Sequence, residues 1–95
     1  MPEEKRVVVV NATPIIALTL IGKLELLQRL YGQVIIPRAV QSEVLAGGIA
    51  GIGKSELQSA KWIQAKALSD PTRADLLSDL DRGEAEVIAL AQELK

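Results

Sequence analysis

Two short runs of β-branched residues, each followed by a helical pattern, constrain the fold of this chain most strongly. The runs at residues 7–10 (VVVV) and 34–36 (VII) are typical of strands that are buried on both faces. Residues 62–68 indicate a third short strand. Strands that alternate with helices form βαβ units around a parallel sheet. We therefore predict a helix-rich α/β fold with a short parallel sheet of two to three strands.

Turn and cap residues divide the helical segments. Thr13 suits an N-cap and Pro14 suits the first position of a helix, while Ser55 suits the N-cap of a later one. Apolar residues at helical spacing predict which faces are buried. These faces are Leu24, Leu27 and Leu30 in the second helix, and Ala85, Ile88, Ala89 and Ala91 in the last. The predicted helices span residues 15–21, 23–31, 38–45, 55–61 and 72–80, and a last helix opens at residues 81–83.

Composition favours one domain, residues 1–95, with an aliphatic core. Hydrophobic residues make up 48% of the chain, which is enough to bury a core. Trp62 and Tyr31 are the only aromatic residues, so stacking platforms for single-stranded nucleic acid are nearly absent. Lys and Arg total 11 against 12 Asp and Glu, for a net charge of −1. This balance argues against a DNA-binding module, and less strongly against a nuclease whose acidic pocket is neutralised by metal.

The chain contains no Cys and no His, which excludes several kinds of chemistry. Disulfides, zinc sites built on Cys or His, and catalysis by a Cys or His nucleophile or base are all ruled out. Any metal site must use oxygen ligands, which suit Mg²⁺, Mn²⁺ or Ca²⁺. The apolar run at residues 7–21 is interrupted by Asn11, Thr13 and Pro14 and is short for a membrane span. We expect a cytoplasmic protein that does not enter a membrane.

Four side chains stand where oxygen ligands could gather. Asn11 ends the first strand, and the carboxyl ends of strands are where open α/β sheets bind ligands. Glu43 lies in the helix after the second strand, and Glu84 and Glu86 open the last helix. Each has a structural alternative. Asn11 can hydrogen-bond its own turn, Glu43 can belong to a solvated helix face, and the last two can favour a helix dipole.

Residues 48–55 (GIAGIGKS) match the phosphate-binding pattern GxxxxGK[ST] letter for letter. That pattern requires a strand directly before it and a helix directly after it. Here the preceding segment is predicted as a helix, and no later strand ends in a suitable Asp. A flexible glycine loop is therefore the favoured interpretation, and we expect no nucleotide cofactor.

Taken in order, these segments resemble a PIN domain, the metal-dependent ribonuclease fold. The similarity covers nearly the whole chain, and the order and spacing of the segments matter more than any single motif. It is closest to a prokaryotic subfamily related to VapC-type toxins of toxin–antitoxin pairs. The matching segments are residues 8–18 (VVVNATPIIAL), 22–27 (GKLELL), 34–40 (VIIPRAV), 43–44 (EV) and 80–91 (LDRGEAEVIALA).

The resemblance implies a Rossmann-like α/β/α domain whose acidic residues hold one or two Mg²⁺ or Mn²⁺ ions for RNA cleavage. By position, Asn11 stands where the family's first Asp usually lies. Glu43 matches the second acid and Glu84 the third, with Glu86 as a neighbouring metal ligand. Thr13 matches a small hydroxyl residue that supports the site beside the first acid. RNA as substrate and an antitoxin protein as partner are further implications of the resemblance.

Two departures from the family pattern change the expected activity. Asn11 offers a neutral oxygen where a carboxylate is usual, which weakens a site for a hard cation. The family also continues past the point of Lys95 with a strand that ends in an acidic motif, so the resemblance implies a C-terminally truncated domain. We expect weak or absent cleavage. We also expect a homo-oligomer that buries the open edge at residues 7–10 and the exposed face of the last helix. The alternative function is a non-catalytic remnant that oligomerises or binds a partner.

Overall fold

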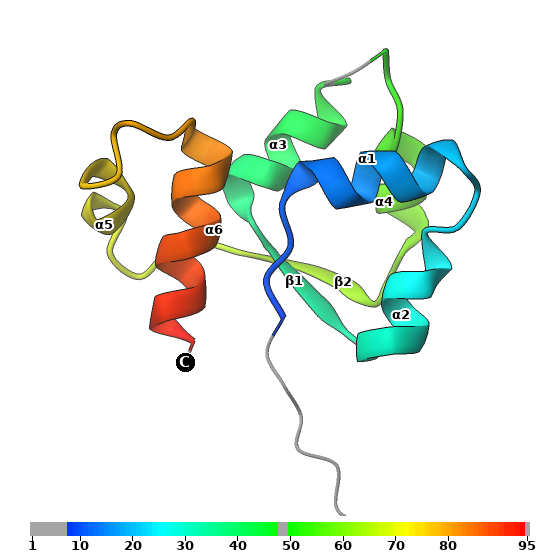
Figure 1. The fold of residues 1–95 in the computed structure, drawn as a ribbon, viewed down its shortest axis with the longest axis horizontal. Helices are drawn as coiled ribbons and strands as arrows, with labels where there is room; N and C mark the ends of the chain where they lie inside the picture. The colour runs from blue at the N-terminus through cyan, green and yellow to red at the C-terminus, as the bar shows by residue number, and fades with distance from the viewer. Residues whose placement is uncertain (1–7, 48–49, 95) are drawn as a thin grey trace, which may run out of the picture.

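The computed structural model describes residues 8–47 and 50–94 and shows a helix-rich α/β fold (Figure 1). Its two-stranded parallel sheet confirms the predicted fold class. None of the helices within the described residues is long and apolar enough to cross a membrane. The elements are, in order, α1 (Ala12–Leu20), α2 (Glu25–Tyr31), β1 (Val34–Pro37), α3 (Arg38–Leu45), α4 (Lys54–Ser59), β2 (Ile63–Lys66), α5 (Thr72–Asp75) and α6 (Arg82–Glu93).

The sheet is built around β1. On one side β1 pairs in parallel with β2, and Val34 lies opposite Ile63. On the other side lies the end of the valine run. There the Val10 N–H donates to the Ile35 carbonyl, and the Ile35 N–H donates to the Val8 carbonyl, both at 2.9 Å. The predicted first strand is therefore a short extended segment with one parallel bridge, from Val9 to Ile35, because the chain turns into α1 directly afterwards. Val7 lies outside the described residues.

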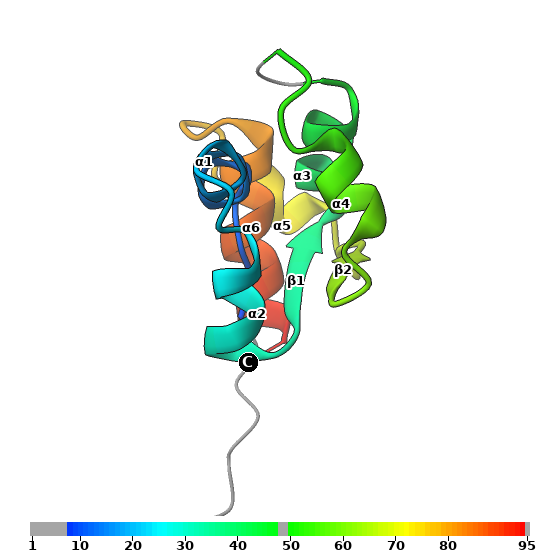
Figure 2. The ribbon, with the colours of Figure 1, turned by 90° about the vertical axis from the view of Figure 1, so that its right-hand side faces the viewer.

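Alternate side chains of β1 face two apolar clusters. Val34 and Ile36 belong to the larger cluster, which includes Ile15 of α1 and Val40 and Val44 of α3. Ile35 packs against the smaller cluster, formed by Leu68, Ala74, Ala85, Ala89 and Leu90. Seen from the side, α1, α2 and α6 lie to one side of β1, and α4 lies to the other (Figure 2). The alternation expected of a strand buried on both faces thus holds for β1.

The start of α1 differs from the prediction. Asn11, not Thr13, is the N-cap, because its backbone is extended and its Oδ1 accepts the Ala12 N–H at 2.8 Å. Thr13 lies exposed in the first turn of the helix. Pro14 is tolerated in that turn because the first four N–H groups of a helix have no partner within it. The prediction of Thr13 as the cap was therefore wrong, and α1 begins three residues earlier than expected.

The glycine loop also ends earlier than predicted. α4 begins at Lys54, and Gly53 rather than Ser55 precedes its first turn. Gly53 has a φ of 92°, and a Cβ at this position would lie 3.3 Å from Val44 Cγ1. A left-handed backbone in close contact with α3 favours glycine. Gly48 and Ile49 lie outside the described residues, and α3 followed by a turn precedes the loop, so the strand that a phosphate-binding loop requires does not stand there.

Three other helix predictions were only partly right. α5 ends at Asp75, and the Leu77 and Leu80 N–H groups each bond to the carbonyl three residues earlier, so the predicted helix 72–80 gives way to tight turns. In α2 only the first of its two turns contributes to the core, because Leu30 is 70% exposed. In α6 the apolar face is centred on Ala85, Ala89 and Leu90, which leaves Ile88 and Ala91 exposed.

Candidate functional site

An open hollow of about 610 Å³ lies where α3 meets the first turn of α6. Both helices start at this place, because β1 leads directly into α3 at Pro37, and Asp81 begins α6. We call this space the acid hollow, since it contains two exposed carboxylates, those of Glu43 and Asp81. It is lined by Ala39, Ser42, Glu43, Asp81, Arg82 and Gly83.

Both carboxylates of the acid hollow lie close to Gly83. A Cβ at residue 83 would lie 3.2 Å from Glu43 Oε1 and 3.5 Å from Asp81 Oδ1. It would also lie 3.7 Å from Val40 Cγ2, so α6 approaches α3 closely at this point. Both acidic oxygens are therefore within 3.5 Å of a single position. A side chain at residue 83 would occupy the space between them.

Asp81 is the site residue that the sequence alone did not identify. Its Oδ1 accepts the Glu84 N–H at 2.9 Å, which makes it the N-cap of α6. The spacing of Asp81 and Glu84, which is typical of a helix start with an acidic residue at its third position, is a signal that could have identified the cap. The sequence predicted the start of the helix at residues 81–83, which the structure confirms. It did not show that the cap lies beside Glu43, which is a contact between distant parts of the chain.

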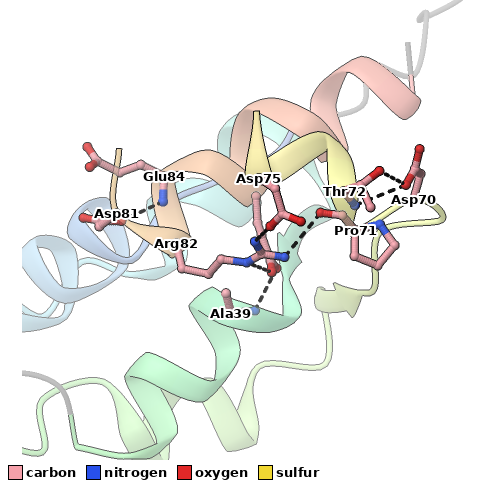
Figure 3. A network of polar contacts seen from close by, with 9 residues as sticks. Ala39, Asp70, Pro71, Thr72, Asp75, Asp81, Arg82 and Glu84 are labelled. Atoms are coloured by element: carbon pink, nitrogen blue, oxygen red, sulfur yellow. Dashed lines mark hydrogen bonds and ion pairs between the residues drawn. The ribbon is translucent and has the colours of Figure 1, made fainter. Parts of the chain in front are cut away.

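Both carboxylate oxygens of Glu86 have partners. Oε1 accepts the Ala39 N–H of α3 at 3.2 Å, and Oε2 accepts Arg82 Nε at 2.8 Å. Arg82 also donates from Nη1 to Asp75 Oδ1 at 2.6 Å, as Figure 3 shows. The hydrogen bond to Asp75 and, next, the one to Glu86 raise the pKa of Arg82. Glu86 therefore connects α6 directly to α3 and, through Arg82, to the segment that contains α5. Its side chain is 13% exposed.

The other predicted residues do not line the acid hollow. Asn11 bonds its own turn through Oδ1, as the structural alternative expected, and it is half-buried. Glu84 is exposed, and its side chain extends away from Arg82 and Ala39 (Figure 3). Thr13 is exposed in α1. Of the predicted site residues, Glu43 lies directly beside the start of α6. The roles of these residues as metal ligands stay a prediction.

The donors at the acid hollow suit a loosely held hard cation. Among residues 8–47 and 50–94, no group of three or more His, Cys, Asp or Glu is placed to hold a metal ion. Mg²⁺ commonly keeps several waters and is bound through one or two carboxylates together with substrate phosphates. Glu43 and Asp81 supply such a pair, both with oxygen donors. These two side chains offer oxygen donors of the kind that Mg²⁺ and Mn²⁺ take, without a closed cage of protein ligands within the described residues.

Comparison with protein families found one match that covers most of the chain. The sequence model of the PIN domain family matches residues 7–95. Searches of curated proteins and of solved structures found no match. The matched span includes every element from α1 to α6 and the whole acid hollow.

Proposed function

This chain belongs to the PIN domain family. From that membership we propose that it is a metal-dependent endoribonuclease that cleaves RNA weakly, or not at all unless a further metal ligand is supplied. The family has a nuclease-like fold and generally depends on divalent metal. One observation carries the proposal for this chain. Oxygens of Glu43 and Asp81, from two different helices, approach one position beside Gly83 at the surface.

In this proposal Glu43 and Asp81 hold Mg²⁺ or Mn²⁺ at the acid hollow, with Asn11 and Glu84 as outer oxygen donors. A bound ion of this kind supplies activation of water and stabilisation of the departing oxygen in phosphodiester cleavage. Gly83 leaves the space in front of both carboxylates free of side-chain atoms.

The expectation of weak turnover has a physical basis in the ligand set. Two carboxylates and a neutral amide carry less charge than a cluster of acids, and lower ligand charge weakens the binding of a hard cation. Binding of RNA receives little help from the rest of the chain, which has a net charge of −1 and two aromatic residues. We propose the VapC-related, toxin–antitoxin setting for this activity, with RNA as substrate, an antitoxin protein as partner and the cytoplasm as location.

The second candidate function is a non-catalytic protein that assembles with copies of itself or with other PIN proteins. It is favoured by the valine segment at residues 8–10, which pairs with β1 through its bonds to Ile35. Within the described residues, no further strand pairs with the opposite side of that segment. Such edges pair readily with other chains.

The proposed function is tested by titrating Mn²⁺ into the protein in a calorimeter. We expect saturable binding that Glu43→Gln and Asp81→Asn each weaken by at least about tenfold, since each removes one charged ligand. Glu25→Gln is the matched control, because Glu25 is exposed on α2, and α2 contributes no residue to the lining of the acid hollow. Figure 1 shows α2 apart from the start of α6. The control should bind Mn²⁺ like the parent protein.

Cleavage of a single-stranded RNA is then measured with and without Mn²⁺. Cleavage that requires Mn²⁺ and is lost in Glu43→Gln supports the enzyme. Absence of Mn²⁺ binding, or equal binding in all four proteins, contradicts the proposed metal site. Assembly without metal and without cleavage favours the second candidate.

A further inference from the structure

We propose that Glu86 is a positioning residue that sets the approach of α3 to α6 and thereby brings the carboxylates of Glu43 and Asp81 to one place. The family resemblance suggested Glu86 as a metal ligand. Its contacts point to a different role, in which it acts through the backbone of α3. The inference rests on the proposed function only for the role of Glu43 and Asp81 in metal binding. The placement of these two side chains by Glu86 does not depend on that function.

The bond from Glu86 reaches α3 directly below Glu43. Glu86 Oε1 accepts the Ala39 N–H at 3.2 Å, across a separation of 47 residues in the chain. Ala39 and Glu43 are four residues apart in α3, so they lie on the same face of that helix, one turn apart. The Ala39 N–H is one of the first four of α3, which have no partner inside the helix. Glu86 thus supplies the missing acceptor and fixes the position of this turn.

The second oxygen of Glu86 holds its side chain in place. Oε2 pairs with Arg82 Nε at 2.8 Å, one turn earlier in α6. Arg82 is itself held by Asp75 Oδ1 at 2.6 Å and by the Pro71 carbonyl at 3.4 Å. With both oxygens engaged, the Glu86 carboxylate cannot turn toward the acid hollow without giving up these bonds. Its low exposure of 13% is consistent with a buried brace rather than an open ligand.

Two features therefore set the spacing of α3 and α6 at the acid hollow. Glu86 draws the helices together through the Ala39 N–H. Gly83 allows the close approach, since a Cβ there would lie 3.2 Å from Glu43 Oε1. Without the brace, the first turn of α6 can move away from α3, and Asp81 moves with it.

The other end of α6 offers a matched control. Glu93 accepts the Ser69 and Asp70 N–H groups at 2.9 and 3.0 Å. Like Glu86, it is a glutamate of α6 that accepts backbone N–H groups from a distant segment. It lies more than two turns from the acid hollow. A purely structural loss of α6 docking should follow from the removal of either residue, whereas a loss of position at the hollow should follow only from the removal of Glu86.

The test uses a chain that has no native cysteine, so a pair of introduced thiols is unique. The parent carries Glu43→Cys and Asp81→Cys, and disulfide formation is timed in metal-free buffer with a mild oxidant. Adding Glu86→Ala should slow the reaction by at least about tenfold, because small displacements strongly reduce the rates of oriented reactions. Glu86→Gln should slow the reaction less than Glu86→Ala, because its amide oxygen can still accept the Ala39 N–H although its amide nitrogen cannot accept from Arg82. Glu93→Ala should leave the rate unchanged.

Other outcomes overturn the inference. A Glu86→Ala rate equal to that of the parent, or an equal loss in Glu93→Ala, would each show that Glu86 does not set this geometry. Mn²⁺ titration of the proteins without introduced cysteines tests whether Glu86 is a metal ligand instead. If Glu86→Gln loses as much affinity as Glu43→Gln, Glu86 is a ligand and the inference fails.

The proposed function can fail on its own in this experiment. Disulfide rates that follow the expected order, in a protein that binds no Mn²⁺, would leave Glu86 as the positioning residue and remove the metal site. Mn²⁺ binding that depends on Glu43 and Asp81, with rates that do not depend on Glu86, would give the reverse conclusion.

Discussion

The two ends of α6 use the same kind of side chain for different purposes. At the C-terminal end, Glu93 accepts two backbone N–H groups of the segment before α5. At the N-terminal end, Asp81 lies close to Glu43 of α3, and Glu86 is the acid with partners for both of its oxygens. A carboxylate surrounded by N–H donors stabilises the fold. Asp81 both caps α6 and lies beside the carboxylate of Glu43.

The difference follows from what each end packs against. The C-terminal end meets a loop whose Ser69 and Asp70 N–H groups donate to the carboxylate of Glu93. The N-terminal end meets a helix that presents its own acidic side chain. The middle of α6, with Ala85, Ala89 and Leu90 buried, holds both ends in place. Stability should therefore depend on the middle first, then on the caps, and least on single surface carboxylates.

The largest expected effect comes from breaking the middle of α6. Leu90 is 1% exposed and packs in the smaller apolar cluster. Leu90→Ala should lower the free energy of unfolding by about 2–5 kcal/mol, because it removes buried methyl groups and leaves a cavity. Both ends of the helix should then loosen together. Urea unfolding followed by circular dichroism measures the change.

Leu76→Ala is the matched control, since Leu76 is 84% exposed. It should change the free energy of unfolding by no more than about 0.5 kcal/mol. Equal effects of the two substitutions would mean that α6 is not anchored through Leu90, and the comparison of its two ends would lose its basis.

The second effect separates the two roles of Asp81 at the N-terminal end. Asp81→Ala removes the N-cap and should cost about 0.5–2 kcal/mol. Asp81→Asn keeps an oxygen that can accept the Glu84 N–H, so its stability should stay close to that of the parent. Both substitutions remove the charge at the acid hollow and should weaken Mn²⁺ binding alike. An Asp81→Asn protein that binds Mn²⁺ normally would make Asp81 a cap alone.

The fold was largely predictable from local patterns. The apolar run at residues 34–36 predicted β1 to within one residue, β2 lies within the predicted segment 62–68, and the start of α6 was predicted at residues 81–83. The errors arose where two residues compete for one role. Asn11 and Thr13 both suit an N-cap, and the extended backbone of Asn11 decided between them. Gly53, and not Ser55, precedes α4, because close contact with Val44 favours glycine there.

The candidate site was less predictable because its contacts join distant segments. The sequence presents Glu84 and Glu86 as equivalent acids in one helical turn. Only the folded chain shows that Glu86 meets the Ala39 N–H while Glu84 remains exposed. Asp81 was missed for the same reason, since a cap motif contains no information about the helix opposite. Periodicity predicts which face of a helix is buried, but it does not predict which polar groups that face will meet.

The smallest expected effect tests the C-terminal end of α6 through its pH dependence. Hydrogen bonds from the Ser69 and then the Asp70 N–H groups lower the pKa of Glu93 below its ordinary value. A carboxyl whose pKa is lower in the folded state stabilises the fold above its unfolded pKa of about 4.3. That contribution is lost as the pH falls through the folded-state pKa. Glu93→Gln should therefore have a slightly lower urea midpoint than the parent at about pH 7, and the two midpoints should converge below about pH 3.

Because the other carboxyl groups titrate in both proteins, the difference between the two urea midpoints reports Glu93. A difference that stays constant with pH would mean that packing of the side chain, rather than its charge, holds this end of the helix.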